Sequence, residues 1–312
     1  MIDFRYHVVS LAAVFLALAV GVLLGTTQLS SAVSDDLRGQ VRQLDGDKRD
    51  LQARLRTLQD QGKSEETMIA ALAPKLVAGT LRSAKVVLVA TPQAADATVD
   101  GVQQALEQAG ARVTGRVQLT DDYADPRRAA DATAYVTGGG QPAGFQLPES
   151  QDAGVLSGAL LSYALLGTRQ ADPAPTVTSE VLSGFASLRM LRVDSAQVTP
   201  ADLAVVVTSG AVRGADPAGR LGTLGDLVSA LDGAGRGAVV AGTAAAAGRD
   251  GLVGAVRTDS GLASAVSTVD SADRPVGPVA TVFALAQQGA GRSGQYGTAA
   301  GAEAPFPPTS AS

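Results

Sequence analysis

The side chains able to carry chemistry are few, and most are carboxylates. Asp121, Asp122 and Asp125 follow a predicted strand, and Asp270 and Asp273 precede a predicted helix. Paired carboxylates can act as acid and base or bind hard cations. The first group, however, has the pattern of a helix N-terminus, where negative charge is favourable, and the second has that of a turn before a proline. We therefore assign no catalytic residue to either group.

Other catalytic and metal-binding groups are nearly absent. The chain has no cysteine, and His7 is its only histidine. These counts exclude a cysteine nucleophile, a thiolate metal site, a Ser-His-Asp triad and a histidine zinc site. We predict no catalytic residue, no metal ligands and no cofactor, and hence a protein that is not an enzyme. The net charge of −5 excludes nucleic acid as a partner, since phosphate binding needs a basic surface.

Two glycine-rich strings resemble nucleotide-binding loops only in spacing. Gly289–Gly294 matches the dinucleotide fingerprint, but it follows a predicted helix instead of a strand. Gly138–Gly140 follows a possible short strand at Ala134–Thr137, yet it lacks the Lys-Ser/Thr pair of a phosphate-binding loop. We interpret both strings as loops.

The N-terminus is the strongest positive signal in the sequence. Residues 8–24 carry no charge and are almost wholly apolar, and uncharged residues continue to position 29. At about 1.5 Å per residue, such a helix crosses the ~30 Å hydrocarbon core of a membrane. A cleaved signal peptide is the alternative, since small residues at 29–32 could serve a peptidase. The weakly charged start and the long apolar run favour an uncleaved anchor over residues 1–30.

The charges that flank this helix predict its orientation. Arg5 precedes it, whereas Asp35 and Asp36 are the first charges after it. The positive-inside rule then places the N-terminus in the cytoplasm and the bulk of the chain outside, in the cell envelope.

Small residues recur every four positions within the span, at Ala13, Ala17, Gly21 and Gly25. This spacing puts them on one helix face, where a second helix can approach closely. Chance spacing in an alanine-rich helix explains the pattern equally well.

Residues 31–78 are predicted to form a coiled-coil stalk. Leucines recur every seven residues, and two intervening core positions are also apolar, while Lys48 occupies a third. The seam consists of Leu37, Val41, Leu44, Leu51, Leu55 and Leu58. Because so short a helix is marginal alone, its leucine face must bury against something. We favour a parallel homodimer, with packing against the chain's own soluble part as the alternative.

The remainder predicts an α/β domain over residues 79–288. Apolar strands alternate with amphipathic helices, a pattern typical of a mostly parallel sheet flanked by helices. Strands are predicted over Lys85–Ala90, Ala111–Leu119, Ala201–Thr208 and Gly237–Ala241. Helices are predicted over Thr98–Gly110, Gln151–Leu166, Leu221–Leu231 and Val279–Gln287. We predict loops at 137–148 and 168–176, and a Gly/Pro-rich tail at 289–312 that follows the surface or is disordered.

Four blocks together resemble the mycobacterial copper transport protein B family of actinobacteria. They are MIDFRYHVVSLAAVFLALAVGVLLG at 1–25, the leucine heptads, VSTVDSADRPVGPVATVFAL at 266–285 and the QYG…APFPP tail. The likeness covers nearly the whole chain. It implies an envelope protein of copper transport and copper homeostasis, for whose mycobacterial members an outer-membrane or pore role is proposed.

The ligand inventory opposes direct copper binding. Copper prefers thiolate, thioether and imidazole ligands, and the chain offers only Met1, Met68 and Met190 beside His7. Our first hypothesis is therefore an anchored oligomer in copper homeostasis that docks onto another envelope component without coordinating copper. The alternatives are an envelope scaffold or binding module unrelated to copper, and a pore or channel component.

Overall fold

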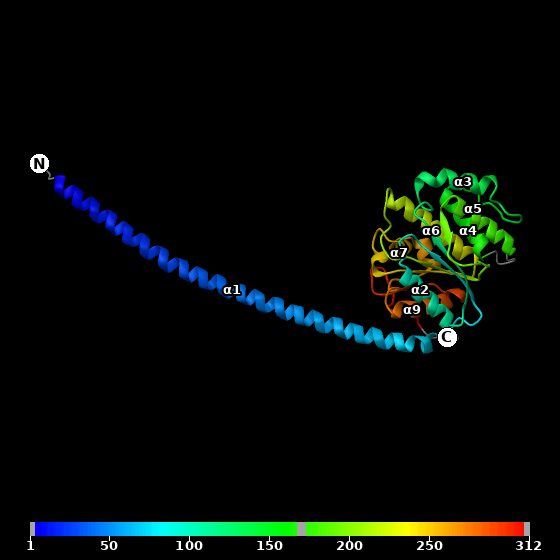
Figure 1. The fold of residues 1–312 in the computed structure, drawn as a ribbon, viewed down its shortest axis with the longest axis horizontal. Coiled ribbons are helices and arrows are strands. Elements are labelled where there is room, and N and C mark those ends of the chain that lie inside the picture. The colour runs from blue at the N-terminus through cyan, green and yellow to red at the C-terminus, as the bar shows by residue number, and fades with distance from the viewer. Residues whose placement is uncertain (1–3, 167–172, 309–312) are drawn as a thin grey trace. The chain divides into compact units, whose positions relative to one another are not determined.

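The computed structural model describes residues 4–166 and 173–308, without the side chains of residues 26–39. The side chain of Leu37, in the predicted seam, is therefore not described. Most of the predicted loop at 168–176 also lies outside the described residues. The chain divides into two compact units, residues 1–65 and 66–312 (Figure 1).

One helix, α1 (Phe4–Val77), contains both the predicted span and the predicted stalk. Its last turns belong to the second unit. There Val77 is fully buried, Ala73 packs against the same core, and Glu66 accepts a hydrogen bond from Arg274 at 2.9 Å. A helix is confirmed over most of the stalk, and the coiled coil stays a prediction.

The second unit contains a seven-stranded sheet in the order β3-β2-β1-β4-β5-β6-β7. All neighbouring strands are parallel except β2 and β3. The strands are β1 (Lys85–Ala90), β2 (Arg112–Leu119), β3 (Leu191–Val193), β4 (Leu203–Val207), β5 (Ala238–Ala241), β6 (Ser267–Val269) and β7 (Gln295–Tyr296). The predicted α/β class is confirmed.

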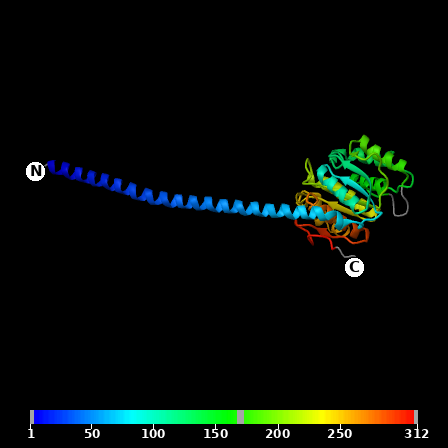
Figure 2. The same ribbon diagram turned by 60° about the horizontal axis from the view of Figure 1, so that its bottom comes forward.

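Helices cover both faces of the sheet (Figures 1 and 2). One face packs against α3 (Ala129–Gly138), α4 (Ala153–Leu166), α5 (Pro175–Ser187), α6 (Pro217–Ala234) and α7 (Leu252–Thr258). The other packs against α2 (Asp96–Gln108), α9 (Val276–Gly289) and the end of α1. Short turns η1 (Pro126–Arg128) and η2 (Ala244–Ala247) and helix α8 (Ser260–Ala265) complete the described elements. Because both faces are covered, central strands such as LAVVV in β4 are apolar throughout.

The four strands and four helices predicted for the α/β domain are all present, with ends shifted by a few residues. The possible strand at Ala134–Thr137 is wrong, because these residues lie within α3. Of these four residues only Val136 is fully buried, which is the pattern of a helix with one face against the core. The apolar run is too short for its periodicity to distinguish a helix from a strand.

The interpretation of residues 289–312 as a tail that follows the surface or is disordered is wrong for part of the described segment 289–308. Gln295 and Tyr296 form edge strand β7 and are only 3% and 5% exposed. Phe306 packs edge-on against Phe283 of α9, with ring centroids 5.6 Å apart. The tail up to residue 308 is thus part of the domain, although its glycine and proline content is typical of a loop.

Candidate functional site

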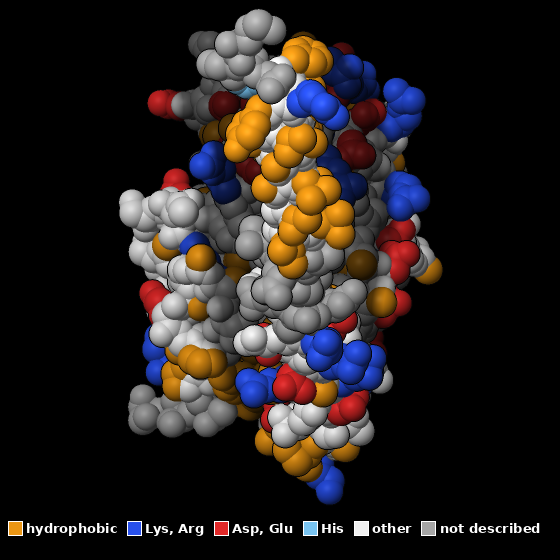
Figure 3. Space-filling model, turned by 90° about the vertical axis from the view of Figure 1, so that its left-hand side faces the viewer, with side chains coloured by type: hydrophobic (Ala, Val, Ile, Leu, Met, Phe, Trp, Pro, Cys, Tyr) orange, Lys and Arg blue, Asp and Glu red, His pale blue; other side chains and the backbone are white. Residues whose placement is uncertain are grey.

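The first candidate surface is the apolar part of α1. Phe4–Gly25 is long and apolar enough to cross a membrane, and all of it is exposed. Figure 3 shows hydrophobic side chains gathered on the front of this helix. The four small residues, Ala13, Ala17, Gly21 and Gly25, lie within it, and a methyl group added at either glycine would meet no atom within 4 Å. Their use in helix pairing stays a prediction.

The described seam residues are strongly exposed in the single chain. Exposed fractions are 55% for Val41, 71% for Leu44, 60% for Leu51, 57% for Leu55 and 64% for Leu58. A row of five exposed aliphatic side chains on one helix indicates a surface that another helix or protein covers. The structure does not pair them, so the parallel homodimer also stays a prediction.

Ligands suited to copper are scarce and scattered. Met190 is 1% exposed within the domain core, Met68 is 59% exposed on α1, and His7 lies in the apolar span. Met1 lies outside the described residues. Among the described residues, no three His, Cys, Asp or Glu side chains gather as they would around a metal ion.

A parallel sheet of this kind usually binds ligands where its strand order reverses, here beyond the carboxyl ends of β1 and β4. Thr91 and Thr208 occupy this position, both fully buried, with their hydroxyls 3.0 Å apart in a hydrogen bond. The backbone N–H of Ala95, which precedes α2, donates to Oγ of Ser209, the residue after Thr208, at 2.9 Å. At this position, therefore, the threonine hydroxyls bond to each other.

Asp125 acts as a cap, as predicted for its group. Its carboxylate accepts the Arg127 backbone N–H at 3.0 Å at the start of η1 and lies 3.1 Å from the buried guanidinium of Arg220 on α6. Hydrogen bonds from Arg127 hold the pKa of Asp125 well below its usual range. Arg220 also donates to the Asp121 carbonyl at 2.8 Å, so this group joins the loop after β2 to α6 and has a structural role.

Asp270 is not the simple turn residue predicted for it. Its side chain is fully buried and pairs with Arg257 of α7 at 2.8 Å, and the Arg257 side chain is 2% exposed. Asp270 also accepts the backbone N–H groups of Thr298 and Ala299 at 2.9 and 3.0 Å. The carboxylate therefore holds the tail, which the sequence alone did not reveal.

Arg257 completes this ion pair from the other side. It donates to the hydroxyl of Thr268 on β6 and to the carbonyls of Tyr296 and Ala300, at 2.8, 2.8 and 3.0 Å. Gly297 lies against the Asp270 carboxylate and has a φ of +132°. A Cβ added there would overlap that carboxylate. The 266–285 block and the QYG segment thus meet around one buried ion pair.

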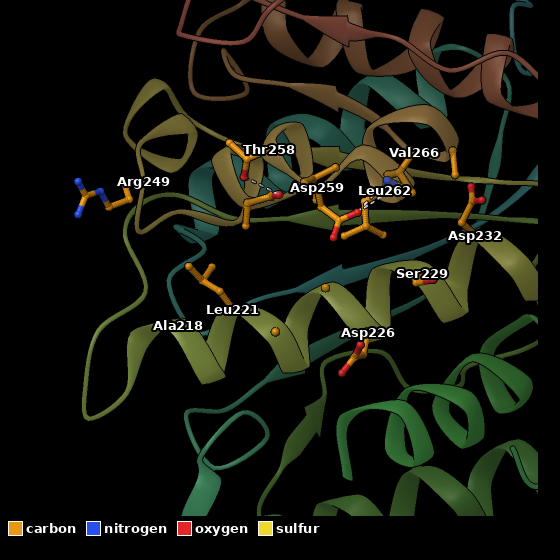
Figure 4. Close-up of a pocket in the computed structure, with 16 residues that line it drawn as sticks. Ala218, Leu221, Asp226, Ser229, Asp232, Arg249, Thr258, Asp259, Leu262 and Val266 are labelled. Atoms are coloured by element: carbon orange, nitrogen blue, oxygen red, sulfur yellow. Dashed lines mark hydrogen bonds between the residues drawn. The ribbon is translucent and has the colours of Figure 1, made fainter. Parts of the chain in front are cut away.

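A groove between α6 and α7–α8 has a volume of about 690 Å³ (Figure 4). Leu221 and several small residues of α6 line one wall, and Leu262, Val256 and Val266 line the other. Asp232 and Arg249 lie at opposite ends, whereas Asp226 points away toward α4.

Asp226 instead faces Asp152 across Gly154 at the start of α4. A Cβ added to Gly154 would lie 2.5 Å from an oxygen of Asp226 and 3.1 Å from one of Asp152. Burial, and then the negative charge of Asp152, raise the pKa of Asp226. Burial, and then the charge of Asp226, likewise raise the pKa of Tyr123.

We expect Asp226→Asn to stabilise the domain at neutral pH. A carboxyl group whose pKa is raised by folding contributes most to the stability of the folded state below its unfolded pKa of about 4. That contribution is lost as the pH rises through the pKa of the folded state. The ionised side chain is therefore unfavourable at pH 7. Because the site is partly solvated, the gain should be below about 1 kcal/mol, or roughly 1–4 °C in Tm.

Thermal unfolding of the detergent-solubilised chain at pH 7 and pH 4 measures this effect. The gain should vanish at pH 4, and exposed Asp273→Asn serves as the control. An equal gain at both pH values would contradict the proposed cause.

Comparisons with known proteins agree with one another. The family model described as "Copper transport outer membrane protein, MctB" matches residues 1–307. Proteins named "Copper transporter MctB" from Mycobacterium tuberculosis H37Rv and Mycobacterium bovis are each 35% identical to this chain. The alignments cover 97% of this chain and 98% of each relative. A protein of the same name from Mycobacterium leprae is 34% identical over the same shares.

Proposed function

This chain belongs to the MctB family of copper transport proteins, and on this basis we propose that it acts in copper transport and homeostasis as a membrane-anchored, non-enzymatic envelope protein. The observation that carries the proposal is the extent of the match. It runs from the apolar helix through the tail that Asp270 holds, so anchor, stalk and domain all belong to the family pattern.

The proposed topology follows from the charges around the span. Arg5 before it, and the absence of lysine or arginine until Arg38, support a cytoplasmic N-terminus. The α/β domain then lies outside the cytoplasm, where copper leaving the cell would pass.

We further propose that the chain works as a parallel homodimer. The exposed leucine seam and the small-residue face of the span support this arrangement, because both lie on one continuous helix. A dimer would cover the seam and leave the two domains side by side on a common stalk.

Copper passage is proposed to depend on another envelope component. A thioether at Met68 and the imidazole of His7 are the accessible soft ligands among the described residues, and both lie on α1, 61 positions apart in sequence. One or two such ligands form a poor copper site. Support or docking of a partner therefore fits the chain better than copper storage in the domain.

Cell-associated copper tests the proposal. We expect a deletion strain to accumulate copper across a copper series, and the complementing gene to restore the wild-type content. Mass spectrometry measures the copper, and zinc in the same samples is the control. Equal copper contents in the deletion, complemented and parent strains would favour the envelope scaffold that acts independently of copper.

A further inference from the structure

The last turns of α1, residues 66–77, belong to the second unit and present two different faces (Figure 1). One face packs against the chain's own domain, where Ala73 contacts the core and Val77 is fully buried. The other face, which we call the terminal patch, consists of Met68, Leu72 and Leu76, with exposed fractions of 59%, 44% and 54%. The two faces lie about a third of a turn apart, so the domain holds the helix end and leaves the patch uncovered.

The terminal patch continues the heptads of the leucine seam. Leu72 lies fourteen residues after Leu58, and Leu76 lies twenty-one residues after Leu55. Both spacings are whole numbers of heptads, so the two leucines occupy core positions in the same frame. Pro74 occupies an outer position of that frame, and its ring stays off the pairing face. The seam and the patch are therefore two parts of one heptad pattern.

A polar break separates the two parts. Gly62 and Glu65 occupy the two core positions between Leu58 and Ile69. A glycine adds no side chain to a coiled-coil core, and two Glu65 carboxylates facing each other would repel. Pairing of the seam therefore does not by itself pair the terminal patch, which makes the patch a separate contact that can be tested separately.

The residues that flank the core favour a second copy of this chain as the occupant. In a parallel pair, each g position faces the e position five residues later in the other helix. None of the five such pairs between residues 40 and 73 brings like charges together. The pairs are Gln40–Asp45, Asp47–Gln52, Arg54–Gln59, Gln61–Glu66 and Met68–Ala73.

We propose that the terminal patch packs against the same patch of a second copy, so that the two α/β domains form a fixed pair at the end of the stalk. This inference rests on the proposed homodimer. Three side chains on about 12 Å of helix are too few to pair two free chains. Once the seam has joined the chains, the contact is intramolecular, and its high effective concentration favours it.

Cysteine cross-linking tests this contact, since the chain has no cysteine of its own. Leu72→Cys places a thiol at a core position, whereas Ala71→Cys, fourteen residues after Thr57, places one at the same outer position as Thr57. Both residues are exposed, so neither change removes a core contact. Under mild oxidation of the full chain in its own membrane, Leu72→Cys should cross-link at least tenfold faster than Ala71→Cys.

A distance measurement tests whether the domains form a fixed pair. Spin labels on Gln104→Cys, an exposed position of α2, should give one narrow distance distribution between the two copies. Leu72→Glu with Leu76→Glu should broaden that distribution while the seam cross-link of Leu51→Cys persists. Leu147→Glu, which changes a 37% exposed leucine in the loop after α3, should leave the distribution narrow.

Equal cross-linking rates at positions 71 and 72 would overturn the inference, as would a broad distance distribution without the two glutamate changes. Cross-linking of Leu51→Cys without that of Leu72→Cys would reject the fixed domain pair and leave the stalk dimer intact. Failure of both cross-links would reject the homodimer itself. The copper test above is independent of all these results.

Discussion

Replacing Asp270 with asparagine is expected to destabilise the folded domain by about 3–5 kcal/mol, the usual effect of removing one partner from a buried ion pair. The Arg257 side chain, 2% exposed, would remain buried without a counter-charge, and the N–H groups of Thr298 and Ala299 would lose a charged acceptor. Domains have a total stability of about 5–15 kcal/mol, so much of the margin would be lost. Chemical unfolding of the solubilised chain measures this loss in the free energy of unfolding.

Asp273→Asn provides the matched control, because Asp273 lies three residues on and is exposed. It should change stability by no more than about 0.5 kcal/mol. Changing Arg257 to methionine together with Asp270→Asn should recover part of the loss, since no unpaired charge then remains. Equal destabilisation by Asp270→Asn and Asp273→Asn would show that the ion pair does not hold the tail.

The second large effect concerns the seam. Since the chain has no cysteine, a single Leu51→Cys reports on pairing without interference. In a parallel dimer the two introduced thiols face each other within disulfide distance, so we expect nearly complete cross-linking under mild oxidation. Thr57→Cys, on the outer face of the same helix, should remain uncross-linked.

Leu44→Ser with Leu58→Ser, added to Leu51→Cys, should abolish that cross-link. Removing a buried leucine costs about 2–5 kcal/mol, and each tenfold change in affinity corresponds to about 1.4 kcal/mol. The dissociation constant should therefore rise by at least about 10³-fold. Lys48→Leu should have the opposite effect. Cross-linking that survives the double serine change would refute the seam, and it would leave the small-residue face of the span as the remaining interface.

How far the sequence predicts the structure depends on the length of each pattern. The 22-residue apolar span and central strands such as Leu203–Val207 are long enough for composition alone to identify them. β6 and β7 have three and two residues, too few for any periodicity, and the sequence does not predict them. The sequence assigns Asp270 to a turn for a related reason, since nothing local indicates that Arg257 and the tail enclose it.

Local sequence is sufficient to establish the apolar helix, the leucine heptads, the α/β class and the scarcity of copper ligands. Each of these follows from composition or from spacing along one helix or strand. The folded structure was needed to show that the tail completes the sheet, that Asp270 is buried, and that α6 and α8 form the walls of a groove. These features join residues far apart in the chain, such as Asp270 and Thr298, and their free energy comes from burial and charge pairing that exist only after folding.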